Sequence, residues 1–463
     1  MGASHSKFLL PLLFTGVLMG ALDIAIIGPA LPAIQAEFDM NSRELAVLFN
    51  AYVLFQMLGT QLLAKMADRV GTRNVYVAGI SLFALGSLML VIAGDMYTLY
   101  AGRAIQGLGA GGIFPVASTV IAGRMPPEKR GAALGLLGTV WGIAFLIGPI
   151  LGGLLLKFSW HWLFLVNLPI AAVLIVGAIR LLPKEPARQH RPFDIAGAAT
   201  LSTAVIALVL GINNLDTAAV FDSMLSLQVT PFLLIVAVML PLFWHFEKRA
   251  ADPVIRPGML ATRQVTTACI IAAGVGAMQT AGVFYPAMAV ASMDVSLSDA
   301  AFLLVPGVVL STIAAPIVGR LINVVGTRLI VLVALVLSVI SFLIYGALEL
   351  TVATFIVANL IGGLASAGLV GAPLRWTILN ESRPEERAAA QGLLSNVTSV
   401  GRLIGAATVG AVATAQGGGV SGYQSAFLGM AILCVTLFAL ALTLKSKAAE
   451  QDISDAAAEP ARA

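Results

Sequence analysis

The chain has 463 residues, of which 59% are hydrophobic and only 11% are charged, and its mean hydropathy is +0.95. Because a soluble domain carries about 25% charged residues, this composition excludes an ordinary soluble domain and predicts a surface that faces lipid. The net charge of +4 is too small to indicate a nucleic-acid partner. The two cysteines, Cys269 and Cys434, lie in apolar segments and indicate neither a disulfide framework nor a metal site.

Apolar segments long enough to cross a hydrocarbon core of ~30 Å recur along the chain. Since lipid cannot hydrogen-bond the backbone, each segment must be a helix that satisfies its own amide groups. The first is a span rather than a signal peptide, because its apolar run continues through Asp23 to Pro29 and further spans follow. The fourteen predicted spans are residues 8–29, 45–64, 75–94, 98–121, 132–155, 161–182, 194–213, 228–246, 265–290, 299–322, 328–348, 351–376, 388–412 and 423–444.

Basic residues are distributed unequally between the two sides of the predicted membrane. The two termini and the connections on their side hold 23 of the 27 basic residues, whereas the opposite connections hold only Arg43 and Lys157. The positive-inside rule therefore predicts a multi-pass protein of the cell inner (plasma) membrane with both termini in the cytoplasm. Residues 448–463, rich in alanine and acidic residues, are predicted to form a disordered cytoplasmic tail.

The connections after the second and tenth spans share a four-residue sequence. Val70-Gly71-Thr72-Arg73 recurs as Val325-Gly326-Thr327-Arg328, at an offset of 255 residues. Such a pair is typical of a transporter built from two related halves, although any short cytoplasmic hairpin also favours glycine and arginine. The offset predicts an N-terminal six-helix half over residues 1–186, two inserted transmembrane helices over 187–256 and a C-terminal six-helix half over 257–447.

Five segments occur in the order and spacing of a known transporter family. They are Leu22–Ile34, Ala64–Arg73, Arg103–Gly109, the series Gly135, Gly148, Pro149, Gly152 and Gly153, and Trp160–Pro169. Over nearly the whole chain these segments resemble the fourteen-helix drug:proton antiporter branch of the major facilitator superfamily. Three positions depart from the family pattern: Ala64 and Ala144 replace glycines, and His161 stands where arginine is usual.

The resemblance implies an all-α membrane protein with the major facilitator fold, in which two six-helix halves are accompanied by two extra transmembrane helices. It further implies a monomeric secondary active transporter, surrounded by membrane lipids and needing no cofactor. The expected activity is export of lipophilic or amphipathic compounds, drugs among them, in exchange for protons. A dedicated exporter or flippase of a lipid, peptide or metabolite on the same scaffold is the alternative that the sequence leaves open.

Enzymatic chemistry is not indicated. A membrane-embedded enzyme would need a nucleophile–base pair or a metal-binding constellation at membrane depth, and we identify none in the sequence. ATP drive is not expected either, because no phosphate-binding GxxxxGK[ST] loop occurs. The segment Gly107–Gly112 fits a dinucleotide-binding pattern, but it lies inside a predicted span, and we interpret it as a helix-packing face.

Asp23 is the only acidic residue well inside a predicted span. An ionised carboxylate there is costly and is a functional candidate by default. At a rise of about 1.5 Å per residue, Asp23 and Arg103 of the fourth span reach a similar depth. Burial and a nearby cation shift the pKa of a carboxyl group in opposite directions, so such a site can exchange protons near neutral pH. We predict that Asp23, Arg103 and Gln106 couple transport to protons, a purely structural polar pair being the alternative.

Two further segments are candidates for moving or sealing parts. A cytoplasmic gate is predicted to form from Asp68, Arg69, Gly71 and Arg73. Asp68 can accept hydrogen bonds at a helix N-terminus, where negative charge is favoured. A solvated, positively charged loop is the alternative. The antiporter motif comprises Gly135, Gly148, Pro149, Gly152 and Gly153. Its small residues allow close helix packing, Pro149 favours a kink, and the resemblance implies that it seals one half against the other and limits leak.

Arg402, in the thirteenth span, has no acidic partner at its depth in the sequence. It could bind an anionic group of a substrate or neutralise a lipid phosphate. The absence of further embedded acids from the second half weakens the interpretation as a multidrug exporter of cations. The other candidates for lining a substrate cavity, each equally suited to packing or interhelical hydrogen bonding, are Asn50, Tyr52, Gln56, Trp141, Gln279, Phe284, Tyr285, Asn359 and Asn396.

Overall fold

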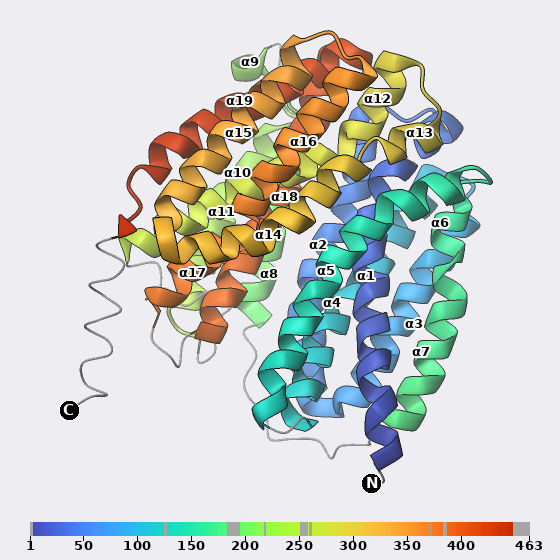
Figure 1. Cartoon of the computed structure of the whole chain (residues 1–463). Coiled ribbons are helices and arrows are strands. Elements are labelled where there is room, and N and C mark those ends of the chain that lie inside the picture. The colour runs from blue at the N-terminus through green and yellow to red at the C-terminus, as the bar shows by residue number, and fades with distance from the viewer. Residues whose placement is uncertain are drawn as a thin grey trace. The chain divides into compact units, whose positions relative to one another are not determined.

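The structure is a computed structural model that describes residues 3–124, 127–182, 195–216, 219–250, 258, 262–370, 372–382 and 387–447. Within these ranges the chain forms helices and short connections but no strand (Figure 1), so the predicted all-α fold is confirmed. The predicted tail over 448–463 and the predicted domain boundaries near residues 186 and 256 lie outside the described residues.

One compact unit contains Met1–Phe193 together with Val295–Phe302, a segment from much later in the chain. Helix α4 packs against both α2 and α3, and α1 packs against α5 and α7. The helices of this unit are α1 (Ala3–Phe38), α2 (Ser42–Val70), α3 (Thr72–Val91), α4 (Met96–Arg124), α5 (Pro127–Leu156), α6 (His161–Leu165), α7 (Asn167–Leu181) and α13 (Leu297–Phe302).

The second compact unit contains Asp194–Asp294 and Leu303–Ala463. Here α11 packs along α18, and α15 packs against α16 and α19. The elements of this unit are α8 (Ile195–Asn213), α9 (Val220–Met224), α10 (Thr230–Glu247), α11 (Arg263–Ala281), the 3-10 helix η2 (Gly282–Phe284), α12 (Tyr285–Met293), α14 (Val305–Val325), α15 (Thr327–Ala347), α16 (Val352–Leu369), α17 (Ala372–Asn380), α18 (Arg387–Ala415) and α19 (Gly419–Ala441).

The described residues contain thirteen helical segments long and apolar enough to cross a membrane. The remaining predicted span, 132–155, lies within the continuous 30-residue helix α5, which includes the apolar segment Gly142–Leu156. The structure therefore agrees with the fourteen predicted spans, and the chain is a multi-pass membrane protein. Helices α8 and α10, the two predicted extra spans, pack against each other, and α8 also packs against α18. Only 11% of the α10 segment is buried, compared with 50% of the α8 segment, so α10 is the more peripheral helix.

The predicted end of the first span was wrong. Residues 8–29 were expected to form the span, but α1 continues to Phe38 through both Pro29 and Pro32. Proline lacks a backbone donor, yet membrane helices tolerate it because neighbouring helices and side chains satisfy the freed carbonyl groups. The proline-rich sequence therefore did not mark the end of this helix.

Three predicted spans are each divided into two helical pieces. The breaks lie at Val166, between α6 and α7; at η2, before α12; and at residues 303–304, between α13 and α14. Pro286 and Pro306 each stand in the first turn of the helix that follows a break. A missing amide is harmless at that position, so proline favours a new helix start there.

The repeated Val-Gly-Thr-Arg sequence forms the same local structure twice. Gly71 joins α2 to α3 with φ 88° and ψ 149°, and Gly326 joins α14 to α15 with φ 82° and ψ 164°. A residue with a Cβ rarely adopts this conformation, which belongs almost entirely to glycine. Thr72 and Thr327, which follow the two glycines, are both buried. The two connections are therefore structural equivalents.

We expect Gly71→Ala and Gly326→Ala each to lower the free energy of unfolding by about 1–3 kcal/mol, because alanine is strained at these backbone angles. Denaturation of the purified protein in detergent micelles would measure the change. Gly429→Ala in α19 is the control, since its added Cβ would meet no heavy atom within 4 Å and its φ is not positive. Equal stability of all three variants would show that neither connection depends on glycine.

Candidate functional site

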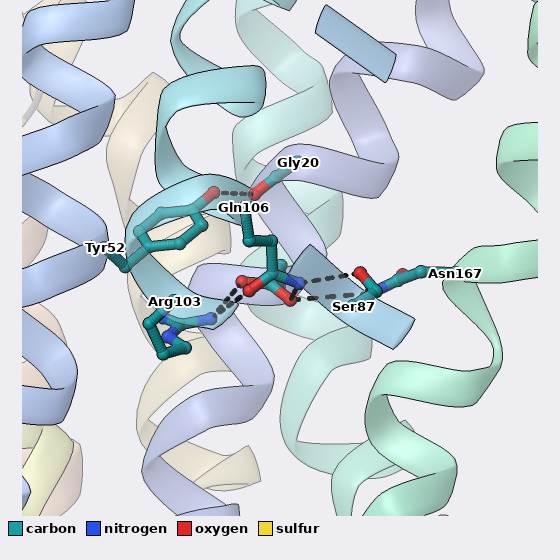
Figure 2. Close-up of polar contacts among 7 residues, drawn as sticks. Gly20, Tyr52, Ser87, Arg103, Gln106 and Asn167 are labelled. Carbon is teal, nitrogen blue, oxygen red and sulfur yellow. Dashed lines mark hydrogen bonds and ion pairs between the residues drawn. The ribbon is translucent and has the colours of Figure 1, made fainter. Parts of the chain in front are cut away.

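Asp23, Arg103 and Gln106 form one hydrogen-bonded cluster inside the first unit (Figure 2). Arg103 Nη1 donates to Asp23 Oδ2 at 2.6 Å, and Gln106 Nε2 donates to Asp23 Oδ1 at 2.8 Å. Arg103 Nη1 also donates to Gln106 Oε1 at 2.7 Å. All three residues expose 0% of their surface. The structure thus brings together the three residues that the sequence analysis selected for proton coupling.

Close packing of α4 between its neighbours holds two of these side chains in place. A Cβ at Gly86 of α3 would lie only 2.6 Å from Gln106 Cβ, and a Cβ at Gly107 would collide with the carbonyl oxygen of Tyr52 on α2. Gly109 and Gly111 likewise abut the α3 and α2 backbones. The interpretation of Gly107–Gly112 as a packing face is therefore confirmed, and the close approach of three helices fixes where Arg103 and Gln106 project.

Two residues that the sequence analysis gave no role extend the cluster. Ser87 Oγ accepts a hydrogen bond from Gln106 Nε2 at 2.9 Å, and Asn167 Nδ2 donates to Ser87 Oγ at 3.4 Å and to Asp23 Oδ1 at 3.5 Å. Asn167 belongs to the Trp160–Pro169 motif, so its place in that motif was a signal for it. A single serine in an apolar span gave no such signal.

Tyr52 also belongs to this cluster rather than standing apart from it. The centre of its ring lies 4.2 Å from Arg103 Cζ, a distance that allows a cation–π interaction, and its hydroxyl donates to the Gly20 carbonyl at 3.4 Å. Arg103 Nε and Nη2 have no hydrogen-bond acceptor in the part of the chain that the structure describes. The guanidinium is therefore held by one carboxylate, one amide oxygen and one aromatic face.

The chemistry of this cluster follows from the burial of its charges. Removing an ion pair from water costs several kcal/mol per ion, which only close mutual contact can offset. A proton on Asp23 would remove the attraction to Arg103 and leave the guanidinium with Gln106 Oε1 and the Tyr52 ring. Gain or loss of one proton would thus change the contacts between α1 and α4, the helices that carry these groups.

The candidate gate residues lie at the connection between α2 and α3. Arg69 is exposed in the last turn of α2, Gly71 is the positive-φ connection, and Arg73 is half-buried in the first turn of α3. The side chain of Asp68 lies outside the described part of the structure. These residues adjoin one another in sequence, and the structure does not bring them into the Asp23 cluster.

The glycine-proline motif of α5 packs against the helix that carries Asp23. A Cβ at Gly148 would lie 2.5 Å from Ala25 Cβ, and one at Gly152 would lie 3.2 Å from Pro29. Gly153 contacts α13, whose Ser298 Oγ donates to the Gly153 carbonyl at 2.5 Å. Pro149 is buried and lies inside the continuous helix α5. The surroundings of Gly135 lie outside the described residues.

The remaining cavity candidates fall into separate groups. In the first unit, Asn50 is buried and Gln56 half-buried on α2, while the side chain of Trp141 lies outside the described residues. In the second unit, Asn359 Oδ1 accepts the backbone amide of Gly307 at 2.7 Å, which joins α16 to α14.

An aromatic group and one polar pair account for the rest of the second unit's candidates. Tyr285 stacks on Tyr345 with ring centres 4.4 Å apart. The ring centre of the buried Phe284 lies 6.2 Å from that of Tyr423. Arg402 of α18 hydrogen-bonds Gln279 of α11, while Asn396 is half-buried on α18. The described candidates thus comprise Tyr52, which belongs to the Asp23 cluster, an aromatic group, an arginine–glutamine pair and four polar residues on α2, α16 and α18.

We expect Asp23→Ala and Arg103→Ala each to lower the free energy of unfolding by about 3–5 kcal/mol, because each leaves an unpaired buried group. The double variant should lose less free energy of unfolding than the sum of the two single losses. A denaturation series in detergent micelles measures this coupling.

The control is the surface pair Lys445–Glu381, whose atoms lie 2.5 Å apart and whose side chains are 32% and 12% exposed. Its coupling should be only about 0–1 kcal/mol. Additive losses for Asp23 and Arg103 would contradict a mutually dependent buried pair.

Comparison with known proteins places this architecture in a family. The sequence model described as the Major Facilitator Superfamily matches residues 13–278 and 266–462. Multidrug resistance protein 3 of Bacillus subtilis is 29% identical over 415 residues, covering 89% of this chain and 80% of that protein. Riboflavin transporter RibZ of Clostridioides difficile is 30% identical over 201 residues, covering 43% of this chain and 44% of that protein.

The fold is also similar to that of solved transporters. A crystal structure of a POT family transporter in complex with 5-aminolevulinic acid aligns with a TM-score of 0.69 at 14% identity, covering 94% of this chain and 95% of that one. At this identity the likeness supports the fold alone. The matched family model and the named relatives show that this multi-pass chain belongs to the major facilitator superfamily and is a transporter of the drug-transporter branch.

Proposed function

We propose that this transporter exports lipophilic or amphipathic compounds in exchange for protons, and that Asp23 carries the proton. The observation that supports this proposal is the fully buried contact of Asp23 with Arg103 and Gln106. Asp23 and Arg103 form the only ion pair with both partners fully buried among the described residues. An acid in this setting within a membrane protein is a functional candidate.

The proposed coupling uses the two protonation states of Asp23. When ionised, the carboxylate accepts hydrogen bonds from Arg103, Gln106 and Asn167. When protonated, it no longer neutralises Arg103, and the contact between α1 and α4 weakens. A substrate that binds better to one of these two arrangements than to the other shifts the equilibrium between them. Substrate and proton then compete, and their exchange across the membrane follows.

Packing against α1 connects this site to the antiporter motif. Gly148 and Gly152 of α5 abut Ala25 and Pro29, two and six residues beyond Asp23. We propose that this interface limits proton leak, because close helix packing excludes water beside the carboxylate. The segment Asp68–Arg73 would gate the cytoplasmic side, with both termini cytoplasmic in the inner membrane of the cell, as the distribution of basic residues favours.

The cargo has two candidates. The similarity to Multidrug resistance protein 3 favours a lipophilic or amphipathic, drug-like compound. The similarity to Riboflavin transporter RibZ over 201 residues favours a dedicated metabolite instead. A dedicated exporter or flippase of a lipid, peptide or metabolite would use the same coupling site, so the two candidates differ in substrate and not in mechanism.

We expect Asp23→Asn to abolish proton-driven accumulation, lowering it at least tenfold, because asparagine keeps the shape of the side chain but cannot release a proton. The measurement is uptake of a lipophilic dye by everted vesicles with an acidic lumen, where the wild type should concentrate the dye. Asp95→Asn is the matched control: Asp95 is an exposed carboxylate at the start of α4, hydrogen-bonded to Thr98.

Accumulation by Asp23→Asn at the wild-type level would rule out Asp23 as the proton carrier. If the wild type moves no dye under any gradient, riboflavin uptake by the same vesicles tests the dedicated-cargo alternative. Proton-driven riboflavin transport that depends on Asp23 would retain the coupling mechanism and replace only the cargo.

A further inference from the structure

Arg402 is a second arginine in the middle of a transmembrane helix, and its surroundings differ from those of Arg103. It lies about 22 Å from the start of α18 and about 20 Å from its end at 1.5 Å per residue. Its Nη2 and Nε donate to Gln279 Oε1 of α11 at 2.8 and 3.2 Å. Both side chains are half-buried, so neither is sealed inside the unit as Arg103 is.

Among the described residues of the second unit, no carboxylate neutralises this cation. Within the described residues no acidic side chain lies within ion-pair distance of Arg402. Neither α11 nor α18 contains an aspartate or glutamate, and the same is true of α8, α17 and α19, which pack against them. A cation at this depth is costly unless a partner or a water-filled space accompanies it. A partner that neutralises the positive charge of Arg402 must therefore come from outside these helices.

The pair retains donors for such a partner. An arginine side chain has five N–H donors, and only Nε and Nη2 bond to Gln279. Among the described residues, no acceptor bonds to Arg402 Nη1 or to Gln279 Nε2. The amide group of Gln279 therefore contributes two further N–H donors to the site. By accepting two bonds on one oxygen, Gln279 orients the guanidinium without neutralising it. A planar guanidinium with free donors matches the geometry of carboxylate or phosphate oxygens.

The backbone beneath the pair is held by close packing. A Cβ at Gly401 would collide with the carbonyl group of Ala273, and one at Gly405 would lie 2.6 Å from the Ala277 carbonyl oxygen. Residues on both sides of Arg402 therefore fix α18 against α11. Because the two side chains project from a rigid helix pair, little conformational freedom is lost when a ligand binds between their donors.

We propose that Arg402 and Gln279 form a binding site for the anionic group of the transported compound, so that the cargo is an anionic or zwitterionic amphiphile rather than a simple cation. This inference rests on the proposed export function and specifies its substrate class. The anionic group supplies the counter-charge that the described residues around Arg402 do not provide, while the apolar body of the cargo remains among apolar side chains. Gln279 acts as a positioning residue through Arg402 and as a direct donor through Nε2.

The experiment uses two rhodamine dyes that differ only in whether one carboxyl group is free or methyl-esterified. Uptake and binding are measured for the full-length protein in proteoliposomes with an acidic lumen. We expect the wild type to favour the free acid and Arg402→Gln to raise the KM for the acid at least tenfold while leaving the ester within about twofold. Gln279→Glu should act in the same direction, since the new carboxylate would occupy the guanidinium.

Controls separate this inference from the proposed function. Arg180→Gln removes a charge from the exposed end of α7 and should leave the KM for both dyes unchanged. Thermal unfolding of each variant in detergent checks that it is folded, and Gln279→Glu should be at least as stable as the wild type because it adds an ion pair. Proton movement driven by the ester reports coupling through Asp23 independently of Arg402.

Each outcome decides one question. Equal KM values for the acid in wild type and folded Arg402→Gln would overturn the anion site while leaving proton-coupled export intact. If Arg402→Gln and Gln279→Glu lose transport of the acid and of the ester to the same extent, the pair has a structural role and the anion site is overturned. If the wild type neither binds nor moves the acid but exports the ester, the preference for anions is wrong. Transport of the acid without any dependence on the pH gradient would instead refute proton coupling.

Discussion

The ion pair between Asp23 and Arg103 is the interaction on which the first unit depends. Two opposite charges at zero exposure can persist only if their mutual contact and their hydrogen bonds replace the lost water. Gln106 and Asn167 provide these bonds to the carboxylate, and the Tyr52 ring covers the guanidinium. Three helices in addition to α1, namely α2, α4 and α7, therefore contribute contacts to one charge pair.

Glycine makes this arrangement possible. Where α4 passes between α2 and α3, the backbones approach so closely that a Cβ at Gly107 or Gly86 would collide with the neighbouring helix. The same device recurs between α5 and α1 and between α18 and α11. In a bilayer, where burial of apolar surface does not drive helices together, such close contacts provide much of the attraction between them.

The two units use an arginine differently. Arg103 is paired with a carboxylate and sealed, whereas Arg402 is oriented by a neutral amide and stays half-buried. This asymmetry is consistent with one unit handling protons and the other recognising charge on the cargo. Equivalent glycine connections at Gly71 and Gly326 show that the repeats share local structure even though their polar groups have diverged.

The sequence by itself determined the all-α membrane architecture, the fourteen spans and the choice of Asp23, Arg103 and Gln106, because hydrophobic length and an embedded charge are local properties. It misplaced the end of α1, since proline breaks a membrane helix less often than a soluble one. Only the tertiary structure showed that Asn167 bonds to Asp23, that Ser87 bonds to Gln106 and that Gln279 holds Arg402. Those partners lie up to 144 residues apart, and which side chains meet depends on helix rotation and close packing, which a periodic apolar pattern does not specify.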